Sequence, residues 1–453
     1  MSERLVIIGA DAAGMSAASQ ARRRRGADDL TIAAFDRGNY ASYSACGIPY
    51  FVGGVVDDFD SLLARRPETF RDEYAIGVHL RHEVEEVDVD RAVLRVRDLN
   101  SGAVRSESFD QLVVATGAVP VRPPRPGSDA DGIYGIQTLD DGVAVQRAVH
   151  ERRPRRAVVV GGGYIGLEMA EALCLLGIDT HLVDAAPHPM TTLDPDMGAL
   201  VAEALREFGV TLHSAQAVVG FEESQGRVSA VQTEEETIPA DIVILGLGVQ
   251  PNVALADAAG IPLGASGAIA VDRRMHTRQA QVWAAGDCAE KRHRVSGEPV
   301  AIALGTHANK EGRVAGINIG GDYATFPGVV GTAATKVCSL EVARTGLTEA
   351  EAAGAGFLSD AVIVESTTRA GYYPDTAPIS TRLVFEQRSG RLLGAQIVGR
   401  EGAAKRIDAL ALALWNEMTV EQLLNVDLSY APPYAPVWDP VLIAARKAYQ
   451  QLG

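Results

Sequence analysis

The sequence predicts an α/β protein with two doubly wound parallel sheets and a smaller third unit, and two glycine-rich turns are the main observations behind this prediction. The stretches RLVIIGADAAGMSAASQARRRR (4–25) and RAVVVGGGYIGLEMAEALCLLG (156–177) each combine an apolar strand, a tight glycine turn and a helix. A second apolar strand that ends in an aspartate follows each helix. The length of 453 residues agrees with about three domains of ordinary size.

The composition is typical of a soluble globular protein. Hydrophobic residues make up 47% and charged residues 22% of the chain, and no apolar run reaches the roughly 18 residues of a transmembrane helix. The formal net charge of −16 argues against a nucleic-acid partner, because phosphate binding needs a basic face. We therefore predict neither a membrane nor a nucleic-acid partner.

The cysteines are scattered along the chain and have neither the spacing of a disulfide framework nor that of a zinc site. They are Cys46, Cys174, Cys288 and Cys338. Asp11 interrupts the N-terminal apolar run, which lacks the features of a signal peptide. Because free thiols suit a reducing compartment, we predict a cytoplasmic protein without a metal site.

The first glycine turn has the layout of a dinucleotide site. Gly9 and Gly14 bound the turn, Ala13 precedes the second glycine, and Asp36 ends the next strand 22 residues after Gly14. This layout places a pyrophosphate at the helix N-terminus and an acid on the adenosine ribose. Asp11 stands where the middle glycine of the pattern belongs, and a carboxylate there is unfavourable unless it points away. An ordinary strand–helix turn is the alternative.

The second glycine turn matches the full pattern and indicates which nicotinamide is used. Gly161, Gly163 and Gly166 have GxGxxG spacing, and Asp184 ends the next strand 18 residues after Gly166. A carboxylate at this position accepts hydrogen bonds from the ribose hydroxyls and repels a 2′-phosphate. No lysine or arginine occurs within residues 180–205 to offset that repulsion. We predict NADH rather than NADPH.

Two further segments indicate that one of the two dinucleotides is a flavin. FDQLVVATGAVPVRPPRPG (109–127) contains a strand that runs into Ala115-Thr116-Gly117, and TRQAQVWAAGDCAE (277–290) contains a strand that ends in Gly286-Asp287. Asp287 can accept a hydrogen bond from the ribityl hydroxyls of a flavin. The order of first glycine turn, lone cysteine, ATG segment, second glycine turn and GD segment resembles the pyridine nucleotide–disulfide oxidoreductase family over essentially the whole chain.

This resemblance implies three domains and a homodimer whose active sites are completed by the partner chain. It implies a Rossmann-like FAD-binding domain (1–152 and 276–328), a Rossmann-like NAD(P)-binding domain (153–275) and an α+β dimerisation domain (329–453). The implied FAD-binding residues are Gly9, Ala13, Gly14, Asp36, Arg37, Ala115, Thr116, Gly117, Gly286 and Asp287. The implied NAD-binding residues are Gly161, Gly163, Tyr164, Ile165, Gly166, Asp184 and Gly248. Tyr164 stands where the family places an aromatic gate over the nicotinamide pocket.

The surroundings of Cys46 indicate the branch of the family. Members with paired cysteines use a CxxxxC motif and a C-terminal His–Glu base, but position 41 is alanine and the last histidine is His307. SYSACG (42–47) instead resembles the SxxxCG motif of the single-cysteine branch, which contains coenzyme A disulfide reductases, persulfide reductases, and NADH oxidases and peroxidases. In these enzymes the cysteine rests as a mixed disulfide or a sulfenic acid. Without a resolving cysteine, the second thiol must come from the substrate.

Tyrosines favour the coenzyme A disulfide reductases within this branch. Oxidases and peroxidases have a histidine where this chain has Ala12. DLSYAPPYAPVWDP (427–440) and TRAGYYPDT (368–376) resemble reductase segments whose tyrosines reach the cysteine of the partner subunit, where a phenol can donate a proton to a leaving thiolate. The tyrosines concerned are Tyr372, Tyr373, Tyr430 and Tyr434, with Tyr372, Tyr430 and Tyr434 as the catalytic candidates. Packing of a proline-rich loop is the alternative for each.

One face of the first helix is a candidate substrate surface. Ser16, Gln20 and Arg23 fall at i, i+4 and i+7. The resemblance implies that this face lines a coenzyme A channel, with the arginine near the phosphates. Ser42 and His307 are the other substrate residues that we predict. A solvated arginine and a core histidine are the alternatives.

The predicted function is transfer of a hydride from NADH to FAD, then of electrons to Cys46, and then to a low-molecular-weight disulfide. Coenzyme A disulfide or a coenzyme A persulfide is the favoured substrate. Two alternatives stay open, namely an NADH oxidase that reduces dioxygen and a flavin–thiol redox sensor with little turnover. The complete NAD site argues against the sensor.

Overall fold

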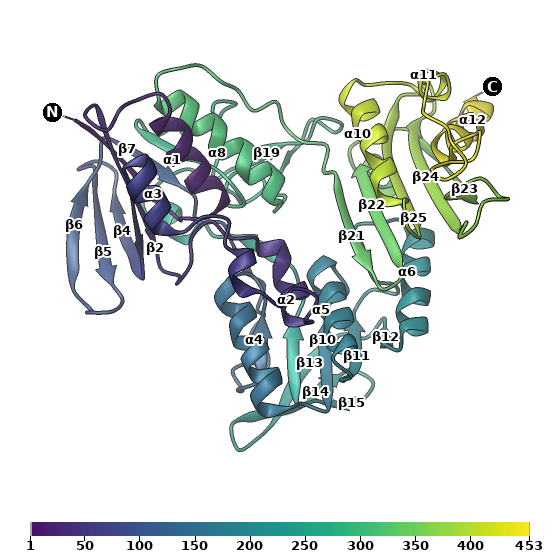
Figure 1. Ribbon diagram of the computed structural model, residues 1–453, viewed down its shortest axis with the longest axis horizontal. Helices are drawn as coiled ribbons and strands as arrows, with labels where there is room; N and C mark the ends of the chain where they lie inside the picture. Colours follow the sequence, from purple (N-terminus) through teal and green to yellow (C-terminus); the bar gives the residue numbers. More distant parts are fainter. Residues whose placement is uncertain (1, 453) are drawn as a thin grey trace.

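The structure, a computed structural model that describes residues 2–452, contains three five-stranded sheets in three lobes (Figure 1). The first two sheets are parallel and the third is antiparallel. This mixed α/β architecture confirms the predicted fold class.

The first lobe contains the first glycine turn. Its sheet runs in the order β18 (Val282–Ala284), β7 (Gln111–Val114), β1 (Glu3–Ile8), β2 (Leu30–Asp36) and β3 (Ile76–Leu80). Its helices are α1 (Ala12–Arg22), α3 (Pro67–Tyr74) and α8 (Gly305–Ile319). A smaller antiparallel sheet of β4 (His82–Asp88), β5 (Val93–Asp98) and β6 (Val104–Ser108) lies at the outer side of this lobe (Figure 1).

Helices α1 and α8 approach each other closely because two glycines leave room for backbone contact. A Cβ atom at Gly312 would lie 2.1 Å from the carbonyl oxygen of Ala13, and one at Gly316 would lie 2.2 Å from that of Ala17. The start of α1 is therefore held against α8, so the first glycine turn has a rigid support.

The second lobe contains the second glycine turn. Its sheet runs in the order β12 (Thr211–Ser214), β11 (Asp179–Asp184), β10 (Arg156–Val160), β16 (Ile242–Leu245) and β9 (Ile133–Gly135). Its helices are α4 (Leu139–Arg152), α5 (Tyr164–Leu175) and α6 (Pro195–Phe208). The short helix α7 (Ala254–Ala258) comes after the chain has returned to the first lobe, where it packs against β4 and its Ala256 belongs to the buried core. The antiparallel strands β13 (Val218–Ser224), β14 (Arg227–Thr233) and β15 (Thr237–Pro239) form its small second sheet.

The change from the first to the second sheet occurs earlier in the chain than residue 152. Strand β9, inside the range 1–152, pairs in parallel with β16 of the second sheet. The chain leaves the first lobe through β8 (Ala118–Pro120) and returns through β17 (Val249–Pro251), and these two strands pair with each other. Residues from β9 onwards therefore complete the edge of the second sheet instead of extending the first.

The third lobe is built on an antiparallel sheet in the order β21 (Ala333–Val337), β22 (Leu340–Gly346), β25 (Leu392–Gly399), β24 (Pro378–Glu386) and β23 (Ser359–Thr367). Its helices are α9 (Glu349–Gly354), α10 (Ile407–Trp415), α11 (Val420–Leu424) and α12 (Pro440–Leu452). Contacts of α5 with β21 and of α6 with β25 join this lobe to the second one. The short strands β19 (Lys291–Arg292) and β20 (Pro299–Val300) pair with each other and lie between β18 and α8 in the chain.

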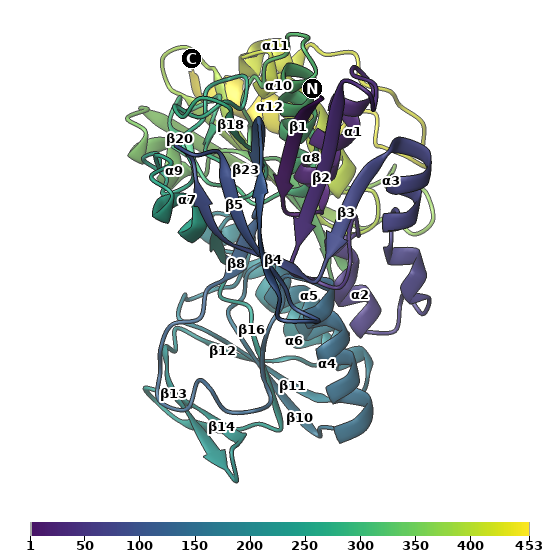
Figure 2. The same cartoon turned by 90° about the vertical axis from the view of Figure 1, so that its left-hand side faces the viewer.

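The short helix α2 (Ile48–Val52) lies where the first and second lobes meet, and it packs against both α4 and α5 (Figure 2). This position matters because the lone cysteine comes directly before α2. Among residues 2–452, no helix combines the length and the apolar character that crossing a membrane requires.

Candidate active site

Cys46 lies in a single 3₁₀ turn (Ala45–Gly47) that leads into α2, and its side chain is exposed. The preceding loop is anchored to the first glycine turn, because the backbone N–H of Ser42 donates to the carbonyl of Ala10 at 2.9 Å. Ser42 has a left-handed backbone with φ of 48°, which is uncommon for a residue other than glycine. The loop therefore presents the thiol beside the first glycine turn in one defined conformation.

The groups around Cys46 are acidic. Although the side chain reaches solvent, partial burial raises the pKa of the thiol, and the carboxylates of Glu168 and Asp287 act in the same direction. Glu168 lies on α5 and accepts a hydrogen bond from the hydroxyl of Thr335 at 2.6 Å. Glu168 is not among the site residues that the sequence predicts, although its i, i+4 spacing from Tyr164 places both residues on one helix face.

The first glycine turn is possible only with glycine at both ends. Gly9 has φ of 105°, and a Cβ atom there would lie 2.1 Å from the carbonyl oxygen of Ala115. A Cβ atom at Gly14 would lie 2.0 Å from the carbonyl oxygen of Gly9. Asp36 accepts hydrogen bonds from the backbone N–H groups of Ala10 and Gly38 at 2.8 and 2.7 Å, so its carboxylate lies at this turn. Ala13 is buried at the start of α1. Arg37 is exposed, and its Nη1 lies 4.0 Å from Oε1 of Glu83.

Asp11 is turned toward the cysteine loop. Its Oδ1 accepts a hydrogen bond from the backbone N–H of Tyr43 at 3.1 Å. Burial, together with the charges of Asp36 and Asp287, raises the pKa of Asp11 to about 6. The acid that breaks the glycine pattern therefore joins the first turn to the loop that carries Cys46.

Asp287 has the geometry expected of a ligand-binding carboxylate. Its Oδ1 is buried and has no hydrogen-bond partner among the described residues, and burial raises the pKa of this group. A buried acceptor without a donor is rare, and a ligand hydroxyl would satisfy it. Gly286 before it has φ of 90°. The residues present therefore fit a flavin dinucleotide that spans the first glycine turn and the Gly286–Asp287 turn.

The segment Ala115–Gly117 lies between these two turns. The N–H of Ala115 donates to the carbonyl of Ile8 at 2.8 Å. The hydroxyl of Thr116 donates to the carbonyl of Asn252 at 2.6 Å, and Gly117 has φ of 68°. This segment thus connects the first sheet with the return from the second lobe.

The second glycine turn has the same close approach. A Cβ atom at Gly161 would lie 2.5 Å from the carbonyl oxygen of Gly246. A Cβ atom at Gly166 would lie 1.9 Å from the carbonyl oxygen of Gly161. Gly163 caps α5, whose first residues Tyr164 and Ile165 are half-buried. Burial raises the pKa of Tyr164. Gly248 is exposed with φ of 82°.

Asp184 lies at the second turn, as its place at the end of β11 predicts. Its Oδ2 accepts from the N–H of Gly162 at 2.6 Å, and its Oδ1 accepts from the N–H of Ala186 at 2.8 Å. The carboxylate is thereby fixed next to the glycine turn.

We predict that NADH exceeds NADPH in kcat/KM by at least about tenfold, which corresponds to roughly 1.4 kcal/mol. Replacing Asp184 with alanine should narrow this difference, because the repulsion of a 2′-phosphate is removed. Asp179→Ala, at the opposite end of β11 and bound to Arg156 at 2.6 Å, is the matched control and should leave the ratio unchanged. Equal efficiency of the two nucleotides in the wild type would contradict the prediction.

The predicted substrate face of α1 contains one arginine without a partner. Arg22, Arg24 and Arg25 all bind carbonyl or carboxylate oxygens of the protein. Within residues 2–452, the side chain of the exposed Arg23 makes neither a hydrogen bond nor an ion pair, and only its backbone N–H donates, to the carbonyl of Ser19. Ser16 donates to Asn309 at 2.8 Å, and Gln20 accepts from Arg24 at 2.9 Å.

His307 is a buried and neutral histidine. Burial, together with the charges of Lys291 and Lys310, lowers its pKa to about 4. Its Nδ1 is buried without a partner among the described residues. A neutral imidazole at this place can accept a hydrogen bond but carries no charge for a phosphate.

The predicted tyrosines all lie on the third lobe, away from the Cys46 of their own chain. The side chains of Tyr372 and Tyr434 are each 77% exposed, and that of Tyr430 is 46% exposed. A hydrogen bond with Tyr372 raises the pKa of Tyr430. The segment before α12 lies on the outer side of the β21–β25 sheet, and α2 lies on the other side (Figure 1). One chain alone therefore does not bring these tyrosines to Cys46.

Two glycine turns with nucleotide-binding geometry, a buried carboxylate that fits a flavin, and a lone thiol beside the first turn define a flavoprotein reductase with a nicotinamide site. The family model described as pyridine nucleotide-disulphide oxidoreductase matches residues 3–312, and the model of its dimerisation domain matches residues 332–440. The chain belongs to the pyridine nucleotide-disulphide oxidoreductase family, which confirms the predicted family and the cofactors FAD and NADH. It is an NAD(P)H-dependent flavoprotein oxidoreductase.

Relatives with assigned activities cover nearly the whole chain. A protein of Pyrococcus horikoshii named NAD(P)H coenzyme A polysulfide/persulfide reductase is 37% identical over 98% of each chain. A Methanocaldococcus jannaschii protein named NADH oxidase is 35% identical over 99% of each chain. The solved structure of reduced Bacillus anthracis CoADR-RHD has a TM-score of 0.96 at 33% identity and covers 100% of this chain and 81% of that one. An NAD-dependent persulfide reductase from A. fulgidus has a TM-score of 0.95 at 38% identity, with 99% and 83% covered.

Proposed function

We propose that this protein uses NADH to reduce a disulfide or persulfide of coenzyme A through the single thiol of Cys46, and that it acts as a homodimer. The observation that carries the proposal is the exposed Cys46, which is anchored to the first glycine turn on a loop without a second cysteine. The names of the relatives, which include coenzyme A persulfide reductase, support coenzyme A as the carrier of the substrate sulfur.

The two turns of the first lobe would hold FAD. We assign the pyrophosphate to Gly9–Gly14, the adenosine ribose to Asp36, and the ribityl hydroxyls to Asp287. When bound, FAD would supply the acceptor for a hydride from NADH and the two electrons that restore the Cys46 thiol. The proposed domain bounds are those of the sequence analysis with two changes. Strand β9 and helix α4 move to the NAD-binding lobe, because β9 pairs with β16 and α4 packs in the core of that lobe. Residues 252–275 move to the FAD-binding lobe, because the chain returns through β17 and buried residues such as Ala256 and Ile269 pack in the core of that lobe.

Cys46 would carry out the exchange step. Its Sγ attacks one sulfur of the substrate, so that a mixed disulfide forms, the substrate S–S bond breaks, and the second sulfur leaves as a thiolate. That thiolate must take a proton, because the acidic surroundings of Cys46 disfavour additional negative charge. No histidine occurs after His307, so a tyrosine is the proposed donor.

Tyr434 of the partner subunit is the proposed donor, with Tyr372 and Tyr430 beside it. Two observations support this assignment. The matched dimerisation domain contains all three tyrosines, and Tyr372 and Tyr434 project from the surface at 77% exposure although large aromatic side chains are ordinarily buried. A dimer interface with an active site at its edge accounts for both observations.

The α1 face would bind the coenzyme A part of the substrate. Arg23 is exposed and unpaired within the described chain, whereas its three neighbours in the basic run bind the protein itself. A free guanidinium can grip phosphate oxygens through two hydrogen bonds. Ser16, Gln20 and Ser42 are assigned to the same channel.

The proposal is tested by measuring NADH consumption in two conditions. The first is under argon with coenzyme A disulfide or a coenzyme A persulfide, and the second is under air without a sulfur substrate. We expect NADH loss under argon only when the disulfide or persulfide is present, with thiol release in proportion. The NADH oxidase named among the relatives makes dioxygen the second candidate acceptor. Oxygen uptake that equals NADH loss, without stimulation by either sulfur substrate, would replace the proposed activity by oxidase activity.

A further inference from the structure

A lysine and a glutamate are completely buried behind the Gly286–Asp287 turn, and the exchange chemistry uses neither of them. Lys291 Nζ lies 3.4 Å from Glu311 Oε1, and both side chains are 0% exposed. Burying two charges costs free energy unless their mutual attraction and further hydrogen bonds offset the loss of hydration. Apolar residues could fill the same space, so the pair calls for a specific role.

The two side chains hold both peptide groups of Gly286. Glu311, from α8, accepts a hydrogen bond from the N–H of Gly286 at 2.8 Å through Oε2. Lys291, from β19, donates to the carbonyl of Gly286 at 2.8 Å and to that of Ala289 at 2.9 Å. Gly286 has a left-handed backbone, with φ of 90°. The orientation of the peptide that leads into Asp287 is therefore set by one anion and one cation from different elements.

The charge of Lys291 also acts on Asp287. Burial raises the pKa of Asp287, and the positive charge of Lys291 lowers it. Burial also raises the pKa of Glu311 to about 7 against the opposing effect of Lys291. Each charge in this group therefore depends on the others, and removal of Lys291 would favour a neutral Glu311.

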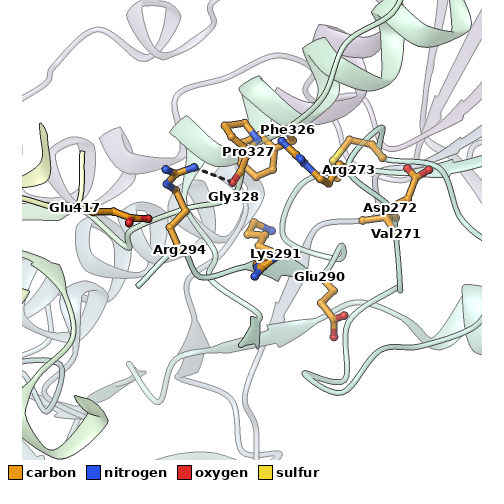
Figure 3. Close-up of a pocket in the computed structure, with 12 residues that line it drawn as sticks. Val271, Asp272, Arg273, Glu290, Lys291, Arg294, Phe326, Pro327, Gly328 and Glu417 are labelled. Atoms are coloured by element: carbon orange, nitrogen blue, oxygen red, sulfur yellow. Dashed lines mark hydrogen bonds between the residues drawn. The ribbon is translucent and has the colours of Figure 1, made fainter. Parts of the chain in front are cut away.

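Lys291 also lines a cavity of about 270 Å³ where the first lobe meets the third, together with residues such as Arg294, Phe326 and Glu417 (Figure 3). Its ammonium group has no exposure, so it lies behind this wall and toward the Gly286–Asp287 turn. The ammonium group of Lys291 therefore binds the backbone of the turn and is not available to a ligand in the cavity.

We propose that Lys291 and Glu311 are positioning residues for the flavin, which orient the Gly286–Asp287 turn and balance the charge beneath it. This inference rests on the proposal that this turn holds FAD, and it is independent of the identity of the disulfide. Two properties of the purified holoenzyme should then depend on the pair, namely the affinity for FAD and the midpoint potential of the bound flavin.

The test compares Glu311→Gln, Lys291→Met and the double variant. Glutamine keeps an oxygen that can accept from Gly286 but leaves the lysine charge unbalanced, so the flavin potential should become more positive. Methionine removes two hydrogen bonds from the turn, so FAD should bind roughly tenfold more weakly, with a smaller change in potential because Glu311 becomes neutral. The double variant should return the potential toward the wild-type value while the weaker FAD binding persists.

Arg382→Gln is the matched control, because it breaks another buried ion pair that lies between the second and third lobes. Arg382 Nε is 3.1 Å from Asp194, and the two side chains are 11% and 4% exposed. This control should unfold at a lower temperature yet keep the wild-type potential and FAD affinity. If the folded variants of the pair kept the wild-type midpoint potential and an FAD affinity within twofold of wild type, Lys291 and Glu311 would have only a structural role and the inference would be overturned.

One further variant separates this outcome from a wrong flavin site. Asp287→Asn should weaken FAD binding if the turn holds the flavin. Unchanged binding in Asp287→Asn would refute the assignment of the turn itself. If a single variant of the pair does not fold, the double variant provides the test, because it buries no unpaired charge. Weaker FAD binding in the double variant would support the inference, and wild-type FAD binding would overturn it.

Discussion

A Cys46→Ser protein is expected to lose disulfide reduction almost completely while it still binds FAD and its flavin is still bleached by NADH. Serine keeps the size of the side chain on the turn before α2, but its hydroxyl cannot form the mixed disulfide. The loop carries no other thiol that could replace it. Because the nucleophile itself is removed, turnover with a coenzyme A disulfide should fall by at least about 10³-fold.

The matched control for this experiment is Cys174→Ser. Cys174 is half-buried on α5, and its thiol donates weakly to the carbonyl of Phe208 at 3.7 Å. We expect near wild-type activity from this variant. Disulfide-dependent NADH oxidation under argon at about a tenth of the wild-type rate or more in Cys46→Ser would exclude Cys46 as the exchanging thiol.

The sequence predicted the parts of the fold that local pattern controls. Each nucleotide turn needs one glycine with positive φ, Gly9 or Gly161, and a second glycine whose Cβ atom would meet the backbone of the first, Gly14 or Gly166. These requirements produce a recognisable sequence motif, so both turns could be located together with the aspartates that follow them. The fold class followed from the same strand–turn–helix units. These motifs depend on residues close together in the sequence. The close backbone approaches at each turn explain why a residue with a Cβ atom cannot replace these glycines.

Features that depend on contacts distant in sequence could not be predicted in the same way. The bond of Asp11 to the N–H of Tyr43 spans two elements, and nothing local marks it. The pairing of β9 with the second sheet is also a long-range choice, so the boundary at residue 152 did not coincide with the change of sheet. Lys291 and Glu311 look like ordinary surface residues in the sequence, because only packing makes them buried.

Tyr434→Phe is expected to slow disulfide turnover and leave the reduction of the flavin by NADH unchanged. Phenylalanine keeps the ring but removes the proton that the leaving thiolate takes. Loss of a general acid lowers rates by about 10²–10⁴-fold, and less where water substitutes. Tyr323→Phe, in the first lobe and 76% exposed like Tyr434 at 77%, is the matched control and should behave as the wild type.

A mixed dimer then tests whether the tyrosine acts across the interface. In a dimer with Cys46→Ser in one chain and Tyr434→Phe in the other, a shared site places both defects together and leaves the second site intact. Such a dimer should retain about half of the wild-type activity, because a two-fold axis makes the two sites equivalent. If each chain used its own tyrosine, one site would lack the thiol and the other would lack the proton donor. The segment before α12, which contains the exposed Tyr434, lies on the outer side of its own β21–β25 sheet, so the partner's Cys46 is the proposed target of this tyrosine (Figure 1). Activity near zero in the mixed dimer would therefore refute the shared site, even if both single variants behave as expected.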